Sequence, residues 1–309
     1  MDLLDVGLDK GFSKTNLAVA RADGQLLLET RIEHFDSDQR PITEERLLDV
    51  IAQQLTPFKA HPLSLFVGGY VQLPRSFFDR PRGSGFDVRT LEVFTDVHNH
   101  YGLTDMPGNA VTVACGSHWN AMYYDDANNV ICFASPCAIW DYVPHSFEGS
   151  TFACFLLAWW SQTWERGTPS PLADEILARS GLSPAALHDT VKQDPQLSTL
   201  SPPSWLALGP LISQHANEEP VASFLDQGIS QLQHLYDQFR MQVNPPSSPL
   251  LVLGGSIWSS ILFERVEGAL ARVGIPTRHS RGNPAHGAIR FRRANPGVQL
   301  EPWASRITR

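Results

Sequence analysis

The sequence predicts an α/β protein in which hairpin-rich sheet occurs twice along the chain. Short apolar strands separated by a polar glycine turn open the chain at 5–32, and a similar series recurs at 111–133. From Gly149 onward apolar residues recur at helical spacing, and one buried-type strand at 250–253 interrupts them. Sheet that recurs in this way, followed by helices, indicates an internally duplicated α/β fold.

Composition restricts the classes of function that this chain can have. The chain has 309 residues, enough for two domains, with 42% hydrophobic and 18% charged residues. A formal net charge of −8 without a basic patch argues against nucleic acid as a partner. The longest apolar run, 152–160, is too short to span a bilayer, and the start lacks a basic export signal. We therefore expect a cytoplasmic protein whose four cysteines are reduced thiols.

The first strand ends on Asp9, and a turn rich in hydroxyls, cations and glycine follows at 10–15. Backbone N–H groups of such a turn can point at phosphate oxygens, and a carboxylate at the strand end can hold hydrated Mg²⁺. The residues that we assign to phosphate binding here are Lys10, Gly11, Ser13, Lys14 and Thr15. An ordinary solvated hairpin explains the same pattern.

Two further strand ends carry candidate chemistry. Thr95-Asp96 follows a strand and precedes a helix, where Asp96 either takes a proton from a substrate hydroxyl or caps the helix. Gly116-Ser117 ends another strand, and small residues there either admit a phosphate or form a plain hairpin turn.

The apolar strand at 250–253 runs into Gly254-Gly255-Ser256 and then a helix. Glycines at this point let a flat ring or a phosphate lie against the backbone, although close strand–helix packing explains them equally well. Glu148-Gly149-Ser150 opens a tryptophan-rich helix, and its acidic first turn is also a plain helix start.

Taken in order, these pieces resemble the actin-like, hexokinase-like ATPases, and within them the group of N-acetylglucosamine kinases and BadF/BadG-type ATPases. The resemblance covers roughly residues 3 to 292. Its motifs lie at Asp9 to Thr15, Thr95-Asp96, Ala114 to Ser117, Phe147 to Ser150, Leu250 to Ser256 and Pro284 to Ala288.

The resemblance implies two ribonuclease-H-like domains that flank a nucleotide-binding cleft. The first would cover residues 1–107, with a C-terminal helix at 284–294 returning to it, and the second would cover 108–283 with a helical insertion. The implied activity is transfer of the γ-phosphoryl group of ATP to a sugar or amino-sugar hydroxyl. A small-molecule acceptor is then the expected partner, and a homodimer is one expected assembly.

The resemblance also implies a role for each motif. Asp96 would be the catalytic base, and Asp9 would hold Mg²⁺ through water. The substrate would meet Thr95, Phe147 and Glu148. ATP would contact the first turn, Gly116, Ser117, Gly254, Gly255, Ser256 and Gly287.

The chain departs from the family pattern in its phosphate turns. Lys10 and Phe12 replace glycines of the first turn, Ala114 and Cys115 replace a glycine and a threonine of the second, and Phe147 replaces an aspartate. These changes keep two alternatives open: a catalytically weakened member that binds a ligand, and a BadF-type ATPase that activates a partner enzyme through an iron–sulfur cluster. Cys115 is a loose match to the cluster ligand of that second class.

Overall fold

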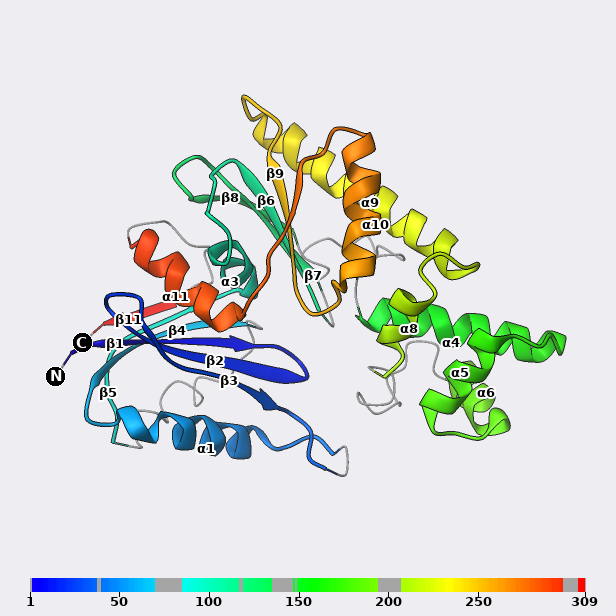
Figure 1. Ribbon diagram of the computed structural model, residues 1–309, viewed down its shortest axis with the longest axis horizontal. Helices are drawn as coiled ribbons and strands as arrows, with labels where there is room; N and C mark the ends of the chain where they lie inside the picture. Colours follow the sequence, from blue (N-terminus) through cyan, green and yellow to red (C-terminus); the bar gives the residue numbers. More distant parts are fainter. Residues whose placement is uncertain are drawn as a thin grey trace.

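The computed structural model describes residues 2–37, 40–69, 85–116, 119–134, 147, 149–193, 207–296 and 305–308. Two β-sheets form its framework, and helices α3 (Asp96–Gly102) and α11 (Pro284–Ala294) lie between them. Figure 1 shows, from bottom to top, α1, the first sheet, α3 with α11, and the second sheet, with α9 and α10 beside the second sheet at the right. The predicted α/β fold class is confirmed.

The first sheet has six strands in the order β11-β5-β4-β1-β2-β3. Strand β1 pairs antiparallel with β2, whereas β1, β4 and β5 run parallel to one another. The C-terminal ends of these three parallel strands therefore meet at one edge of the sheet. The bounds are β1 Leu4–Lys10, β2 Lys14–Arg21, β3 Leu26–Glu33, β4 Pro62–Gly69, β5 Asp87–Phe94 and β11 Ser305–Thr308.

The second sheet has five strands in the order β10-β9-β6-β7-β8. It repeats the first arrangement, because β6 pairs antiparallel with β7 and parallel with β9. Its bounds are β6 Ala110–Cys115, β7 Trp119–Tyr124, β8 Val130–Ala134, β9 Leu250–Gly254 and β10 Thr277–His279.

Helix α1 covers the face of the first sheet that points away from α3 and α11, which we call its outer face. The Thr43 side chain caps α1 by accepting a hydrogen bond from the Arg46 N–H, as the sequence predicts. The remaining helices cover the second sheet or extend beyond it (Figure 1). The bounds are α1 Glu44–Leu55, η1 Thr56–Phe58, α4 Gly149–Arg166, α5 Pro171–Ser180, α6 Pro184–Gln193, α8 Gly209–Gln214, α9 Val221–Val243 and α10 Ser260–Arg272.

Helix α3 touches α11 and both sheets, whereas α11 lies mainly on the first sheet and meets the second through Phe291, whose ring lies beside that of Tyr124. A Cβ atom on Gly102 would lie 2.0 Å from the Gly287 carbonyl oxygen, and one on Gly287 would lie 1.9 Å from the Asn99 carbonyl oxygen. The two backbones approach so closely only because both contact positions lack side chains. This close crossing fixes α3, which carries Asp96, against the first sheet.

Two strands differ from the sequence expectation. The polar sequence after Asn295 shows no strand pattern, yet Ser305–Thr308 forms β11 and pairs antiparallel with β5. Strand β10, with only three residues, was not predicted at all. Such short segments carry too few residues for periodicity to show, and they form by pairing with an existing sheet edge.

Among the described residues, no helix has the length and apolar character needed to cross a bilayer.

Candidate functional site

The alternation of side chains along β1 and β2 separates the residues of the first turn into two groups. Leu8 and Leu17 pack in the core beneath α1, so they lie on the outer face, and Thr15 shares that face. Asp9 and Asn16 point the opposite way, toward α3, which we call the inner face. The predicted phosphate-binding residues of this turn therefore do not face one common point.

Asp9 is buried at the C-terminal end of β1, with 8% of its surface exposed. Its Oδ2 accepts a hydrogen bond of 2.9 Å from Asn16 Nδ2, and its Oδ1 accepts one of 2.7 Å from Asn99 Nδ2. Two amide donors, one from β2 and one from α3, thus fix the orientation of this carboxylate.

Asp96 begins α3 directly after β5, at the sheet edge where β1 also ends. Burial raises the pKa of its carboxyl to about 7, and the negative charge of Asp9 acts in the same direction. Asn120 on β7 opposes this by donating a hydrogen bond of 3.3 Å to Asp96 Oδ1. The residue as a whole is partly exposed, so Asp96 combines a raised pKa with some contact with solvent.

Lys14 carries a positive charge on which the Asp9 carboxylate acts. Burial lowers the pKa of its ammonium and Arg31 lowers it further, whereas Asp9 and Glu33 raise it. Lys14 also lowers the pKa of His100 on α3, which places its charge on the inner face. The carboxylate that acts on Lys10 is instead Glu44 at the start of α1, on the outer side.

His34 on the outer side holds the first turn closed. Its Nδ1 lies 2.8 Å from the Phe12 carbonyl oxygen, and its Nε2 lies 2.8 Å from Thr15 Oγ1. Burial lowers the pKa of His34, so the neutral ring donates from Nδ1 to the carbonyl and accepts the Thr15 hydroxyl at Nε2. The Gly11 N–H donates to the Lys14 carbonyl oxygen within the hairpin. Thr15 is thus bonded to His34 and Gly11 to Lys14, while Ser13 is partly exposed.

Gly254 and Gly255 lie at the corresponding edge of the second sheet. A Cβ atom on Gly254 would fall 2.3 Å from His100 Cγ, and one on Gly255 would fall 1.7 Å from the Cys115 carbonyl oxygen. Gly255 also has a φ of 113°, which favours glycine. The neighbouring Ser256 is exposed. Contacts within the protein therefore account for both glycines, and their predicted contact with adenosine stays a prediction.

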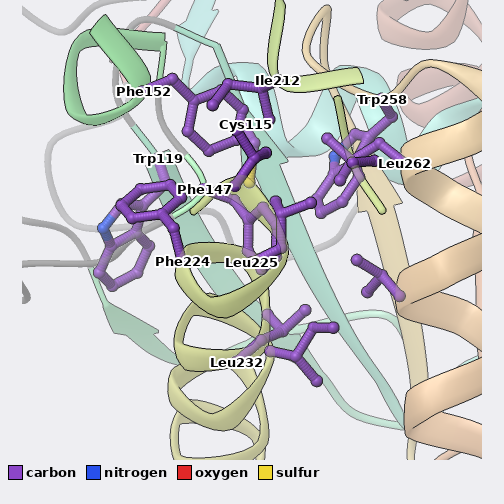
Figure 2. Close-up of a cluster of buried hydrophobic side chains, with 14 of the residues drawn as sticks. Cys115, Trp119, Phe147, Phe152, Ile212, Phe224, Leu225, Leu232, Trp258 and Leu262 are labelled. Carbon is purple, nitrogen blue, oxygen red and sulfur yellow. The ribbon is translucent and has the colours of Figure 1, made fainter. Parts of the chain in front are cut away.

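The three residues predicted to meet the substrate have different surroundings. Thr95 is buried and its hydroxyl faces Met122 Sδ at 3.8 Å. Phe147 lies in the core of the second sheet, its ring centroid 5.1 Å from that of Trp258. Figure 2 shows Phe147, Phe152 and Cys115 gathered in this cluster. Glu148 lies outside the described residues, as does Ser117.

Phe147 thus packs against apolar neighbours, and its predicted contact with a substrate stays a prediction. Cys115 belongs to the same apolar cluster and is 2% exposed, a setting that offers no access to an iron–sulfur cluster. The carbonyl oxygen of Gly116 accepts a hydrogen bond of 2.7 Å from the Gly149 N–H, which ties the second turn to the start of α4.

The structure adds four polar residues that the sequence reasoning did not select: Asn16, Asn99, His100 and Asn120. Asn16 was detectable, because it pairs with Asp9 across the hairpin that the sequence predicts. The other three could be selected only once the position of α3 between the sheets was known, because no local sequence pattern shows that packing. Burial lowers the pKa of His100, and the charges of His279 and Lys14 do so too, against the effect of Asp9. His100 is therefore a neutral ring beside Gly254.

No protein-family model and no curated protein matches the chain by sequence. Solved structures match it along almost its whole length. A candidate N-acetylglucosamine kinase from Porphyromonas gingivalis is 19% identical with a TM-score of 0.62, and the match covers 95% of this chain and 99% of that one. A ROK family glucokinase from Streptomyces griseus, in complex with glucose and AMPPNP, is 13% identical with a TM-score of 0.56, covering 93% and 97%.

A ROK family transcriptional regulator, a homologue of the Escherichia coli MLC protein, shares the fold as well. It is 14% identical with a TM-score of 0.55, and the match covers 96% of this chain and 79% of that one. The same architecture therefore carries both catalysis and regulation. These similarities show that the chain shares the fold of these kinases and of this regulator.

Proposed function

We propose that this protein transfers the γ-phosphoryl group of ATP to a hydroxyl of a sugar or amino sugar. The observation that carries the proposal is Asp96, a partly exposed residue whose carboxyl has a pKa of about 7, beside the oriented carboxylate of Asp9. A general base is most effective when its pKa lies near the working pH. The kinase-like neighbours support this assignment, because they share the fold that brings such a pair between two sheets.

In this mechanism Asp96 accepts a hydrogen bond from the acceptor hydroxyl and removes its proton as the oxygen attacks. Asn120 holds Asp96 Oδ1 from the second sheet, so the carboxylate keeps its direction when it ionises. Lys14 supplies a positive charge on the inner face, where it can neutralise charge on the transferred group. Most of the rate would come from positioning and charge neutralisation.

The residues present fit a hydrated Mg²⁺. Asp9 and Asp96 offer carboxylate oxygens, and each oxygen of Asp9 keeps a lone pair after accepting one amide hydrogen. The described residues hold no group of three or more acidic, His or Cys ligands, but Mg²⁺ needs only one or two carboxylates when water and substrate phosphates complete its shell. When bound, the ion would neutralise phosphate charge, and Asp9 is the residue that would hold it.

An ATP-consumption screen tests the proposal. Purified protein is assayed with amino sugars, neutral hexoses and polyols, with Asp96→Asn beside wild type. We expect at least one acceptor to stimulate ATP consumption, and we expect Asp96→Asn to abolish the stimulation. Stimulation that persists undiminished in Asp96→Asn would contradict the role of the base, and absence of any stimulation would contradict the activity.

Some residues of the first turn already form hydrogen bonds within the protein. This favours a second candidate function, a sugar-binding protein with weak or no ATP turnover. Thr15 donates to His34, Gly11 donates to the Lys14 carbonyl oxygen, and the exposed Phe12 replaces a glycine of the turn. These features reduce the donors left for phosphate. Calorimetry separates the candidates: heat of binding with a sugar but none with ATP and Mg²⁺ would favour the binding protein.

The cytoplasmic location and the homodimer remain parts of this proposal. Light scattering over a wide range of protein concentration measures the assembly, and a constant mass of one chain would contradict the dimer.

A further inference from the structure

Asn99 is a fully buried polar residue of α3, three residues after Asp96. Its Nδ2 donates a 2.7 Å hydrogen bond to Asp9 Oδ1. The reverse orientation of the amide would turn its oxygen toward the carboxylate, so the hydrogen-bond direction is set by Asp9. Asn99 therefore connects the helix that carries Asp96 to the carboxylate at the end of β1.

Strand β4 makes room for this contact. Gly68 on β4 pairs with Asp9 on β1 and with Phe94 on β5, so it lies between the two strand ends that carry the acidic residues. A Cβ atom on Gly68 would lie 2.2 Å from both Asn99 Nδ2 and Asn99 Oδ1. The amide group thus lies flat against Gly68, and any larger residue would displace it.

A purely structural role explains this arrangement poorly. Within the described residues, Asn99 Oδ1 is buried and accepts no hydrogen bond. A buried polar atom without a partner is destabilising, so an apolar residue of similar size would suit packing better. The amide is instead matched to one neighbour, the Asp9 carboxylate, which Asn16 holds from the other side.

We propose that Asn99 is a positioning residue, which holds the Asp9 carboxylate in the orientation that the phosphoryl-transfer site requires. This inference rests on the proposed function, because the reaction gives the orientation of Asp9 its importance. Asn99 itself contacts no substrate. It acts through Asp9, and Gly68 is the position that permits it to do so.

Three variants test the inference: Asn99→Ala, Gly68→Ala and the double variant. Asn99→Ala removes the donor, and we expect kcat to fall about 10- to 100-fold while KM for ATP and for the acceptor stays within about threefold. Gly68→Ala leaves Asn99 chemically intact but pushes its amide aside, so we expect a similar loss of kcat together with a lower Tm. In the double variant the added methyl group fills space that Asn99 vacates.

The double variant distinguishes a positioning role from a structural one, because its Tm and its kcat should respond differently. We expect its Tm to recover toward that of Asn99→Ala, whereas its kcat stays low. A kcat that recovers with Tm, or a kcat in Asn99→Ala within about threefold of wild type, would overturn the inference. Asn295→Ala is the matched control. It removes another buried amide, at the end of α11, whose Nδ2 donates to the Phe291 carbonyl oxygen, and it should lower Tm without changing kcat.

A second measurement keeps the inference open to test if wild type shows no turnover, an outcome that would contradict the proposed function alone. Carboxyl carbon NMR follows the titration of Asp96 in wild type and in Asn99→Ala, with Asp96→Asn to assign the signal. Loss of the Asn99 donor leaves the charge of Asp9 less neutralised, so we expect the pKa of Asp96 to rise. An unchanged or lower midpoint would show that Asn99 does not act on this pair.

Discussion

The two carboxyl groups at the ends of β1 and β5 have different surroundings. Asp9 receives two side-chain amide hydrogens, whereas Asp96 receives a longer side-chain hydrogen bond from Asn120 and backbone hydrogen bonds at the start of α3. Burial and the charge of Asp9 together raise the pKa of Asp96 to about 7. Two neighbouring acids in such different surroundings can take different roles in one site.

The first prediction is a pH dependence of turnover. Asp96 works as a base only when it is deprotonated, so kcat/KM should rise with pH through about 7 and then level off. Asp96→Asn should reduce kcat by about 10²-fold or more and leave the affinity for ATP nearly unchanged. Steady-state assays between about pH 5 and about pH 9 measure both effects. A flat profile below about pH 7, or near-normal turnover in the variant, would leave Asp96 only a structural role in the first turn of α3, whose N-cap is Thr95.

The second prediction concerns how stability changes with pH. Most carboxyl groups in proteins stabilise the fold more as pH rises, whereas Asp96 should stabilise it less. A raised pKa means that the folded state binds a proton that the unfolded state has already lost, so stability falls as pH rises from about 4 to about 7. Asp96→Asn removes this penalty. We expect the variant to exceed wild type in free energy of unfolding by about 1–3 kcal/mol at about pH 8, a value reduced for the partial exposure of Asp96.

At about pH 4 the carboxyl is largely protonated in the folded state and half protonated in the unfolded state, so the advantage of Asp96→Asn should nearly disappear. Urea unfolding of both proteins at the two pH values provides the comparison. An equal difference at both values would mean that Asp96 carries no raised pKa in the folded protein.

The sequence singled out Asp9 and Asp96 as candidates, but it could not show which residues of the first turn share a face of the sheet. A polar turn shows which residue types are present, and only the strand register shows which of them share a face. The register places Asp9 and Asn16 toward α3, and Thr15 toward His34 on the other side. Asn99 and Asn120 come from other elements, so no motif around Asp9 could have indicated them.

At the scale of elements, the crossing of α3 and α11 decides where Asp96 lies. The third prediction tests this crossing with Gly102→Ala, whose added methyl group would meet the Gly287 carbonyl oxygen at 2.0 Å. The two backbones would have to separate, and we expect a loss of about 1–3 kcal/mol in the free energy of unfolding. Urea denaturation measures the loss.

Gly268→Ala on α10 is the matched control, because a Cβ atom there meets nothing within 4 Å. In a helix interior with free space this change should stabilise the protein by about 0.5–1 kcal/mol. Equal effects of the two substitutions would show that the α3–α11 contact tolerates side chains.

Most helices and strands could be predicted, because their apolar residues follow a clear period and Thr43, Pro171 and Pro184 mark helix starts. The position of α3 between the sheets could not be predicted from the sequence. Its seven residues include two buried histidines and a buried asparagine, a composition that local rules assign to the surface. Contacts with Gly254, Gly287 and Asp9 determine their burial, and those partners lie far away in the sequence.

At the scale of the whole molecule, a buried ion pair attaches the C-terminal helix to the first sheet. Arg292 Nε on α11 lies 2.6 Å from Glu92 Oε2 on β5, and both side chains are at most 5% exposed. The fourth prediction is that Arg292→Met, which removes the guanidinium from the buried Glu92 carboxylate, lowers the free energy of unfolding by about 3–5 kcal/mol.

The double variant Glu92→Leu/Arg292→Met removes both charges and should lose much less, because no uncompensated charge remains. Thermal and urea unfolding of the three proteins compare them. A double variant as unstable as Arg292→Met would indicate that the guanidinium hydrogen bonds to the Asn295 and Pro296 carbonyl oxygens matter more than the ion pair.

The last prediction concerns the placement of the site between the two sheets, where a ligand can contact both halves of the molecule. ATP with Mg²⁺ at about 100 times its Kd should add about 2.7 kcal/mol to the free energy of unfolding. For a chain of 309 residues this corresponds to a rise in Tm of about 4 °C.

Two lysine variants test which face of the first turn the nucleotide meets. Lys14→Met should reduce the rise in Tm sharply, because Lys14 shares the inner face with Asp9. Lys10→Met should keep the rise, because the carboxylate that acts on Lys10 is Glu44. Differential scanning fluorimetry distinguishes the two lysines: equal losses would contradict the division of the turn into two faces, and a Tm that ATP and Mg²⁺ do not move would contradict nucleotide binding itself.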